Sequence, residues 1–227
     1  MDTFETLKIF FNMSFENEIN NKMLYYSYHF EYNNVREYVN NLLSIPLSEY
    51  VGYLCDNYNV SYLEAKDILQ FSNFEDFSTK ICKVIKENGD KGFSVLDIGK
   101  FLENDGIVRK DGAYLKYGEN HAKAAREIGL LFSLSNKYFL SCVGYIFNDL
   151  EEKIRNRLLI RLFLRNKLIR RIIYRWKSDG SVDYYNEVGF LSLTTQKRRK
   201  PNIKAIIEFL SKSSEYNFVE LLNNIKF

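Results

Sequence analysis

Apolar positions recur along most of the chain at the three- and four-residue spacing of amphipathic helices. The pattern begins at Asn34, restarts after Pro46, and is clear again in Phe74–Asn88, where Gly89 follows as a stop signal. Only two residues are proline, which also favours helices. We therefore predict a mainly α protein of the α+β type.

The N-terminal third is expected to contain some β-structure. Two aromatic-rich runs, Leu7–Phe15 and Met23–Tyr32, predict strands, and the polar Glu16–Lys22 between them suits a hairpin loop. A helix remains open for the first run. Within Leu54–Leu69 the sequence predicts a helix-turn-helix whose second helix is capped by Ser61, with packing or protein contact as its role rather than DNA reading.

The middle third predicts three helices followed by a hairpin. After the Phe74–Asn88 helix, Ser94 caps a short helix, Val95–Leu102, and a longer helix follows over Tyr114–Leu131. Its inward positions are Leu115, Ala122, Ala125 and Ile128. Two strand-like runs then flank Ser135–Lys137, and this element order is typical of a winged helix.

The last third repeats the order. A long helix is predicted over Leu150–Lys177, Ser181 caps a short helix, Thr194 or Thr195 caps another, and Tyr216–Leu222 supplies a trailing extended segment. We therefore predict three parts: an N-terminal α/β region (1–73) and two winged-helix modules (74–148 and 149–227).

Charge is concentrated toward the C-terminus. Residues 153–227 carry 17 basic and 6 acidic side chains, a balance of +11, while the whole chain balances at +3. A concentrated positive surface is typical of proteins that bind polyanions, of which nucleic acid is the commonest.

Other features of the composition exclude several protein classes. Three dispersed cysteines and two histidines, without ligand spacing, argue against a disulfide scaffold and a metal site. The acidic N-terminus does not resemble a signal peptide, and no apolar run is long enough to span a membrane. We expect a cytoplasmic protein without a cofactor.

The segment Gly189–Leu210 carries a family resemblance. It is similar to the Leu-Ser-x-x-Thr-x-x-Arg-Arg pattern that opens the recognition helix of winged-helix modules in bacterial restriction and anti-phage proteins. The matching positions are Leu191, Ser192, Thr195, Arg198, Arg199, Ile203, Ile207, Phe209 and Leu210. Pro201 departs from the pattern, because the helix must either kink there or begin there. Tyr117–His121 and the residues after it look like a sister module.

The candidate DNA contacts form three sets. The first lies in the predicted recognition helix, the second begins the third helix of the middle module, and the third lies in the basic helix Lys153–Lys177. They are Thr194, Thr195, Lys197, Arg198, Arg199, Lys200 and Lys204; Lys116, Tyr117, Asn120, His121 and Lys123; and Arg161, Arg165 and Arg171. The basic helix could instead hold the acidic N-terminal third, pair with another subunit, or be solvated.

No enzyme signature is convincing. Glu64-Ala65-Lys66 with Asp56 mimics a nuclease motif but lies in a predicted helix, and Gly89–Gly92 lacks the length of a phosphate-binding loop. We therefore predict a non-catalytic protein that binds double-stranded DNA, with target recognition in a restriction or defence system as its role. A replication initiator or transcription regulator, and a protein–protein adaptor, are the alternatives. A nuclease or other protein subunit and a second copy of the chain remain open as partners.

Overall fold

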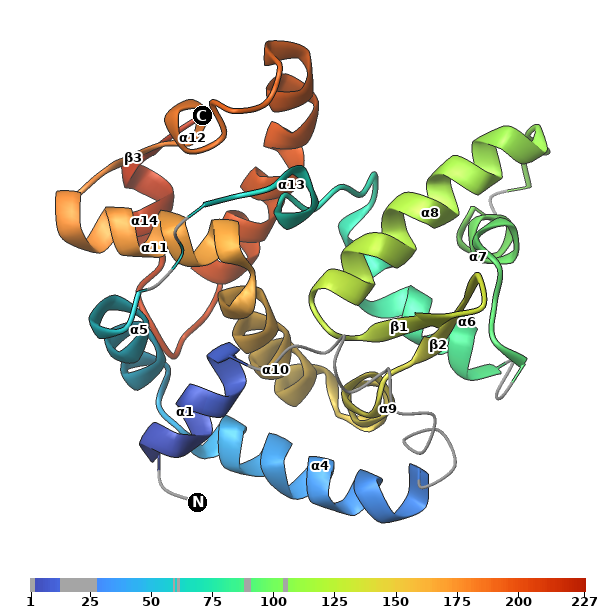
Figure 1. Ribbon diagram of the computed structural model, residues 1–227, viewed down its shortest axis with the longest axis horizontal. Helices are drawn as coiled ribbons and strands as arrows, with labels where there is room; N and C mark the ends of the chain where they lie inside the picture. Colours follow the sequence, from blue (N-terminus) through green and yellow to red (C-terminus); the bar gives the residue numbers. More distant parts are fainter. Residues whose placement is uncertain (1–2, 13–27, 59, 61, 88–90, 104–105) are drawn as a thin grey trace. The chain divides into compact units, whose positions relative to one another are not determined.

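The computed structural model describes residues 3–12, 28–58, 60, 62–87, 91–103 and 106–227. These residues are mainly helical, as predicted, with only short strands (Figure 1). They divide into two compact units. Unit 1 contains the described residues within Met1–Asn12, Asn41–Leu69 and Arg157–Phe227, and unit 2 contains those within Met13–Asn40 and Gln70–Asn156.

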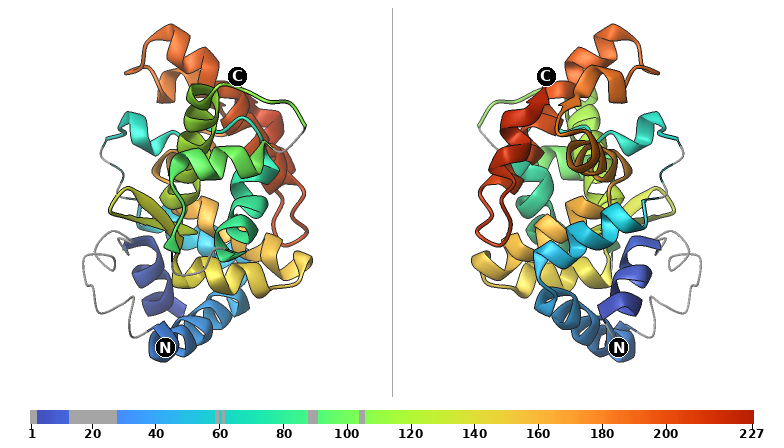
Figure 2. Two further views of the ribbon diagram at one scale, coloured as in Figure 1. Left: turned by 90° about the vertical axis from the view of Figure 1, so that its right-hand side faces the viewer. Right: turned by 90° about the vertical axis from the view of Figure 1, so that its left-hand side faces the viewer.

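The strand prediction is wrong for the described residues of both N-terminal runs, and the helix left open for the first run is what forms there. Thr3–Asn12 forms helix α1 and Tyr28–Ser44 forms helix α4, so aromatic content there did not select β-structure. The predicted hairpin loop, Glu16–Lys22, lies outside the described residues. Helix α5 (Leu47–Asp56) follows Pro46 and contacts α1, where the Phe4 and Tyr53 rings meet edge to face at 5.4 Å (Figures 1 and 2).

Within the described residues of Leu54–Leu69 the predicted helix-turn-helix is absent, and Ser61, its predicted cap, lies outside those residues. Only a short 3₁₀ turn, η1 (Ala65–Asp67), follows α5, and the Asp67 carboxylate accepts a hydrogen bond from the Glu64 backbone N–H at 2.7 Å. The side-chain acceptor thus lies at the end of a single turn and not at the start of a helix.

The first half of unit 2 follows the predicted order. A π-helical turn, η2 (Asp76–Lys80), leads into α6 (Ile81–Glu87), and α7 (Val95–Leu102) and α8 (Asp111–Glu127) follow. Ser94 caps α7 as predicted, since its Oγ accepts from Asp97 N while the Asp97 carboxylate accepts from Ser94 N, both at 3.2 Å.

A hairpin completes this arrangement. Strands β1 (Leu131–Leu134) and β2 (Lys137–Leu140) pair antiparallel around Ser135 and Asn136, whose φ angles are 50° and 62°. Phe93 forms an isolated antiparallel bridge to Tyr138. Helix α9 (Cys142–Asp149) follows, and the core consists of side chains from all these helices and strands: Phe77, Ile81, Ile85, Ile98, Ala122, Ala125, Ile128, Leu131, Leu140, Ile146 and Phe147. Leu115, predicted to face inward, is 41% exposed.

The predicted long basic helix is interrupted. Helices α10 (Glu152–Arg165) and α11 (Lys167–Asp179) are separate because Asn166 leaves the helical conformation and its Oδ1 caps α11 at Ile169 N. Gly180, with a φ of 75°, ends α11.

The rest of unit 1 departs from the predicted trailing strand. Strand β3 (Val182–Asp183) leads into α12 (Tyr184–Glu187), which Asp183 caps in place of Ser181, and helix α13 (Leu193–Ser211) follows. Tyr216–Leu222 ends inside helix α14 (Val219–Asn224), and β4 (Ile225–Lys226) pairs parallel with β3. Thus no antiparallel hairpin follows α13 within 212–227.

The three predicted parts are also distributed differently. Residues 74–148 all fall within unit 2, but residues 1–73 do not form a unit of their own. Residues 41–69 join 157–227 because α5 packs against α11 and because α10 bonds to the end of α4.

Candidate nucleic-acid interface

Helix α13 is fixed by a polar N-terminus and an apolar inner face. Ser192, and not Thr194 or Thr195, is the N-cap, and its Oγ accepts a hydrogen bond from Thr195 N at 3.4 Å. Ile203, Ile206, Ile207 and Leu210 are each 0% exposed. Since these four positions hold one side of the helix in the core, the opposite side faces solvent.

The solvent side of α13 is basic. Thr194, Lys197, Arg198 and Lys204 are exposed, while Thr195 and Lys200 are half-buried. Leu193–Ile207 contain no Asp or Glu. Among the described residues, no carboxylate lies within ion-pair distance of Lys197 or Arg198, and Lys204 pairs with Glu208 at 3.8 Å. We call Thr194, Lys197, Arg198 and Lys204 the α13 face.

Arg199 points away from this face. Its guanidinium donates to the backbone carbonyls of Ala65 and Ile68, the latter at 2.9 Å, and so ties the η1 segment to α13. Burial lowers the pKa of Arg199, and neighbouring Arg198 adds to that effect. Of Arg198 and Arg199, therefore, Arg198 lies on the exposed side of the helix and Arg199 is held internally.

Pro201 does not start a new helix. Helix α13 runs without interruption from Leu193 to Ser211, and Pro201 lies on its exposed side. The prediction that the helix could begin at Pro201 is therefore wrong. The missing backbone donor faces water, where Lys197 O can be hydrated.

Arg161, which the sequence predicted to contact DNA, is buried and cannot reach phosphate. Its side chain is 0% exposed and donates to the carbonyl oxygens of Leu42 at 3.2 Å and Ile45 at 2.8 Å. The last carbonyls of a helix have no partner within it, so Arg161 satisfies the C-terminal end of α4. Tyr50 Oη also donates to Leu42 O, at 2.7 Å.

Other cations of the basic helices are also engaged internally. Arg157 donates to Leu43 O at 2.9 Å and, with Arg161, contacts the Glu215 carboxylate. Arg171 donates to Tyr58 Oη at 3.0 Å and lies 3.7 Å from Glu187. Arg165 is half-buried and has interactions of its own. These three arginines therefore hold residues of the N-terminal third, but through backbone carbonyls and the Tyr58 hydroxyl, while their acidic partners lie in the C-terminal third.

The predicted contacts of α8 separate into buried and exposed groups. His121 is 0% exposed; its Nε2 accepts from the N–H groups of Ser72 and Asn73, and its Nδ1–H donates to Tyr117 O at 2.8 Å. Burial lowers the pKa of His121 and raises that of Tyr117, whose hydroxyl donates to Asp76 at 2.6 Å. Neither residue is available as a DNA reader.

The exposed cations of α8 are paired with an acid on the same helix. Lys116 and Lys123 contact Glu119 at 3.0 and 2.6 Å, and these bonds lower the pKa of its carboxyl, Lys123 contributing most. Asn120 is half-buried. The spacing Lys116–Glu119–Lys123 is visible in the sequence as helical i,i+3 and i,i+4 pairs, a signal that the sequence prediction did not use.

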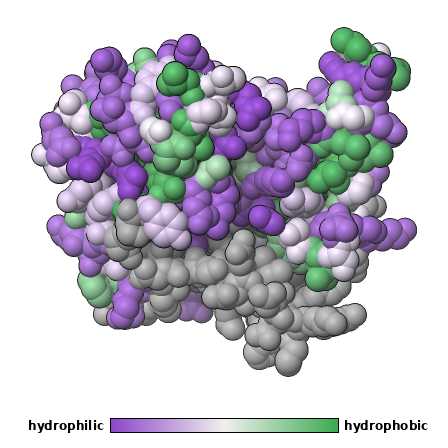
Figure 3. Space-filling view, turned by 45° about the horizontal axis from the view of Figure 1, so that its top comes forward, coloured by the Kyte–Doolittle hydropathy of each residue, from purple (hydrophilic) through white to green (hydrophobic). Residues whose placement is uncertain are grey.

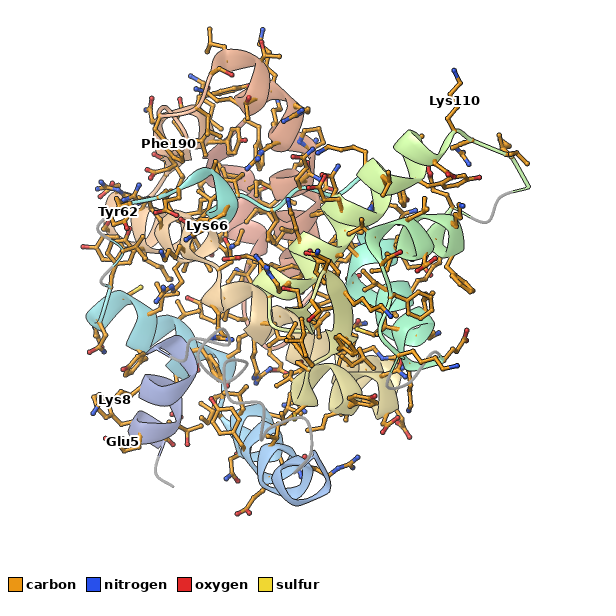
Figure 4. All side chains as sticks on the ribbon, turned by 45° about the vertical axis from the view of Figure 1, so that its right-hand side comes forward. Glu5, Lys8, Tyr62, Lys66, Lys110 and Phe190 are labelled. Atoms are coloured by element: carbon orange, nitrogen blue, oxygen red, sulfur yellow. The ribbon has the colours of Figure 1, made fainter. Side chains whose placement is uncertain are left out.

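A groove runs between α8 and the β1–β2 hairpin. In Figure 1 the hairpin runs back along α8, and Figure 4 shows Lys110, which precedes α8, extending into solvent. The groove is lined by side chains from the start of α7, from α8 and from the hairpin: Val95, Gly112, Leu115, Lys116, Glu119, Lys123, Arg126, Ser133, Leu134, Ser135, Asn136 and Tyr138. Sequence reasoning missed Arg126, Leu115 and Leu134 as surface residues.

In the described part of the chain, no group of three or more histidine, cysteine or acidic side chains is arranged to hold a metal ion. No helix among those residues has both the length and the apolar character needed to cross a membrane.

Comparison with known proteins adds no relative. The sequence matches no protein-family model, and neither the curated proteins nor the solved structures contain a significant match.

Proposed function

We propose that the protein binds double-stranded DNA, without catalysing a reaction on it, through the α13 face. The observation that carries this proposal is the acid-free solvent side of α13, where Lys197 and Arg198 have no carboxylate partner among the described residues. By contrast, Arg157, Arg161 and Arg171 are bonded inside unit 1.

The chemistry of this face suits a duplex. Arginine can donate two hydrogen bonds to guanine in the major groove, which is the role we assign to Arg198. Lysine contacts phosphate as a point charge, which suits Lys197 and Lys204. Thr194 lies in the first turn of the helix, where free backbone N–H groups and the helix dipole also favour a phosphate.

The element order supports a winged-helix architecture as part of the same proposal. In unit 2, α6, the Phe93 bridge, α7, α8 and the hairpin follow the order of that fold. In unit 1, α11, β3, α12 and α13 repeat it, with α14 and β4 in place of the hairpin. The resemblance of Gly189–Leu210 to restriction and anti-phage modules supports target recognition in a defence system as the biological role.

The salt dependence of binding tests the electrostatic part of the proposal. Affinity for a mixed duplex should fall log-linearly with salt, with a slope of about −0.9 per phosphate contacted. Fluorescence anisotropy of a labelled duplex across a salt series measures the slope. Absence of binding at about 50 mM salt would refute the proposal.

Single substitutions test the assignment of roles. Selection from a random duplex pool first identifies the preferred site. On that site Arg198→Ala should lose about 1–3 kcal/mol and relax the preference at one base pair. Lys197→Ala and Lys204→Ala should weaken all duplexes alike and reduce the salt slope by about 1 each.

Lys212→Ala provides the matched control, because Lys212 is an exposed cation at the opposite end of α13. It should leave both affinity and site preference unchanged. If Arg198→Ala and Lys212→Ala have the same effect, the α13 face does not read DNA.

A further inference from the structure

Large apolar side chains form part of the lining of the groove in unit 2. Leu115 from α8 is 41% exposed and Leu134 from β1 is 42% exposed, and Val95 and Tyr138 complete the apolar part of the lining. Figure 3 shows apolar residues, in green, among polar ones on the face that it draws. Large apolar side chains that gather in a groove are typical of a site for another molecule.

The polar part of the lining is predominantly cationic. Lys116, Lys123 and Arg126 contribute three positive charges, and Glu119 contributes one negative charge. Arg126 donates to the Ser133 hydroxyl at 3.2 Å, which holds its guanidinium beside β1. Thus the groove combines apolar side chains with a net positive charge.

We propose that this groove binds an acidic amphipathic helix of a partner protein. Apolar side chains on one face of such a helix would cover Leu115 and Leu134. Its carboxylates would lie beside Lys116, Lys123 and Arg126, where opposite charges favour association and select the partner. This adaptor function uses unit 2 and is independent of DNA binding by the α13 face.

The position of Glu119 favours an acidic peptide over a phosphate backbone as the occupant. Its carboxylate contacts both lysines of α8. A phosphodiester brought to those lysines would lie beside Glu119 and against two exposed leucines. The carboxylates of a peptide helix are spaced by side chains, so they can reach the outer N–H groups of the lysines while apolar residues cover the leucines.

The walls of the groove are rigidly held. A tight turn closes the hairpin, in which both Ser135 and Asn136 have positive φ angles. Lys137 Nζ donates to Lys91 O at 2.9 Å, and Phe93 exchanges backbone hydrogen bonds of 2.9 and 2.8 Å with Tyr138. A preformed groove loses little conformational entropy when a peptide binds.

Selection from a displayed library of random peptides about 16 residues long tests the proposal directly, with the full chain as bait. We expect enrichment of sequences rich in Asp and Glu, with Leu, Ile or Phe at i, i+3 or i+4, and i+7. Failure to enrich any sequence, or enrichment of basic or uncharged ones, would overturn the proposal.

An enriched peptide, labelled and titrated by fluorescence anisotropy, then locates the site. Leu134→Glu should weaken binding of the peptide by about tenfold or more. Lys123→Glu should also weaken it, and Glu→Lys changes in the peptide should restore part of that lost affinity. Val108→Glu is the matched control, since Val108 is 94% exposed in unit 2 and does not line the groove. Circular dichroism of each variant confirms that it is folded.

Two results separate this site from the DNA interface. Arg198→Ala should weaken duplex binding and leave peptide binding unchanged, while Leu134→Glu should do the reverse. If Leu134→Glu and Val108→Glu bind the peptide equally, or if duplex DNA and not the peptide protects the β1–β2 amides from hydrogen exchange, the groove is not a peptide site.

Discussion

His121 illustrates how a residue suited to surface chemistry can serve inside the fold. Its imidazole stacks on Tyr117 with ring centroids 4.1 Å apart. Its Nε2 accepts hydrogen bonds from the backbone N–H groups of Ser72 and Asn73. Tyr117 in turn bonds to Asp76, and Asp76 pairs with Lys80 at 2.9 Å. The neutral ring is needed, because protonation of Nε2 would remove the acceptor for two backbone donors.

This arrangement predicts that unit 2 loses stability in mild acid. Burial lowers the pKa of His121 in the folded state, so the unfolded chain binds a proton more readily. Stability contributed by the neutral ring is therefore complete above about pH 6.5 and falls as the pH decreases below it, by at most about 1.4 kcal/mol per pH unit. Hydrogen exchange of the α8 amides, corrected for intrinsic rates, measures the effect.

His121→Asn supplies the comparison for that prediction. The amide oxygen of asparagine can accept a hydrogen bond and does not titrate, so the variant should be less stable near neutral pH but less sensitive to acid. An equal acid sensitivity of both proteins would show that His121 is not the source of the effect.

At the scale of elements, the crossing of α7 and α8 depends on two glycines. A Cβ atom at Gly118 would overlap the carbonyl oxygen of Val95, and one at Gly99 would overlap that of Tyr114. The helix backbones therefore approach more closely than side chains would permit. This contact sets the angle at which α8 and its groove are presented.

Gly118→Ala should destabilise unit 2 by about 2 kcal/mol or more, since both backbones must move apart. Gly112→Ala is the control, because Gly112 lies in the first turn of the same helix with nothing within 4 Å of the added atom. It should be neutral or slightly stabilising. Thermal unfolding by calorimetry compares the two, and equal midpoints would show that the helices do not meet as described.

The elements predictable from sequence are those with a local cause. The Ser94–Asp97 capping box, the Ser135–Asn136 turn and the glycine that ends α11 each act within a few residues. A side-chain cap of the same kind marks the break at Asn166. The sequence predicted one helix there, because the apolar periodicity continues across the break. Aromatic runs misled at α1 and α4, because the strand preference of aromatic residues is weak and depends on tertiary context.

Over the whole molecule, several cations of the basic C-terminal third serve the fold. Arg157, Arg161 and Arg171 bond to carbonyls and side chains from residues 42–60, whereas Lys197 and Arg198 on the exposed side of α13 have no carboxylate partner among the described residues. The sequence could indicate a positive region. It could not indicate which cations face inward, because those partners lie more than a hundred residues away.

Arg161→Met should accordingly destabilise unit 1 by about 3–5 kcal/mol. The change removes one hydrogen-bond donor each from the partly buried Glu215 carboxylate and from the Leu42 and Ile45 carbonyls. Urea unfolding followed by the fluorescence of Trp176, a buried residue of unit 1, measures the change. Arg175→Met, at a half-exposed ion pair, should change stability by less than about 0.5 kcal/mol. Similar losses in both variants would contradict the role assigned to Arg161.

Because unit 1 is built from separated segments of the chain, its parts cannot all fold at the same stage of synthesis. Residues 70–156, which supply α6 to α9 of unit 2, leave the ribosome as one stretch and can begin to fold together. Helix α5, whose Leu47, Tyr50 and Leu54 are buried, must wait for α10 and α11, because the Arg161 guanidinium lies over the Tyr50 ring and α5 packs against α11. A chain that ends before Arg157 lacks these partners, so the apolar side of α5 stays uncovered by α10 and α11 until they are synthesised.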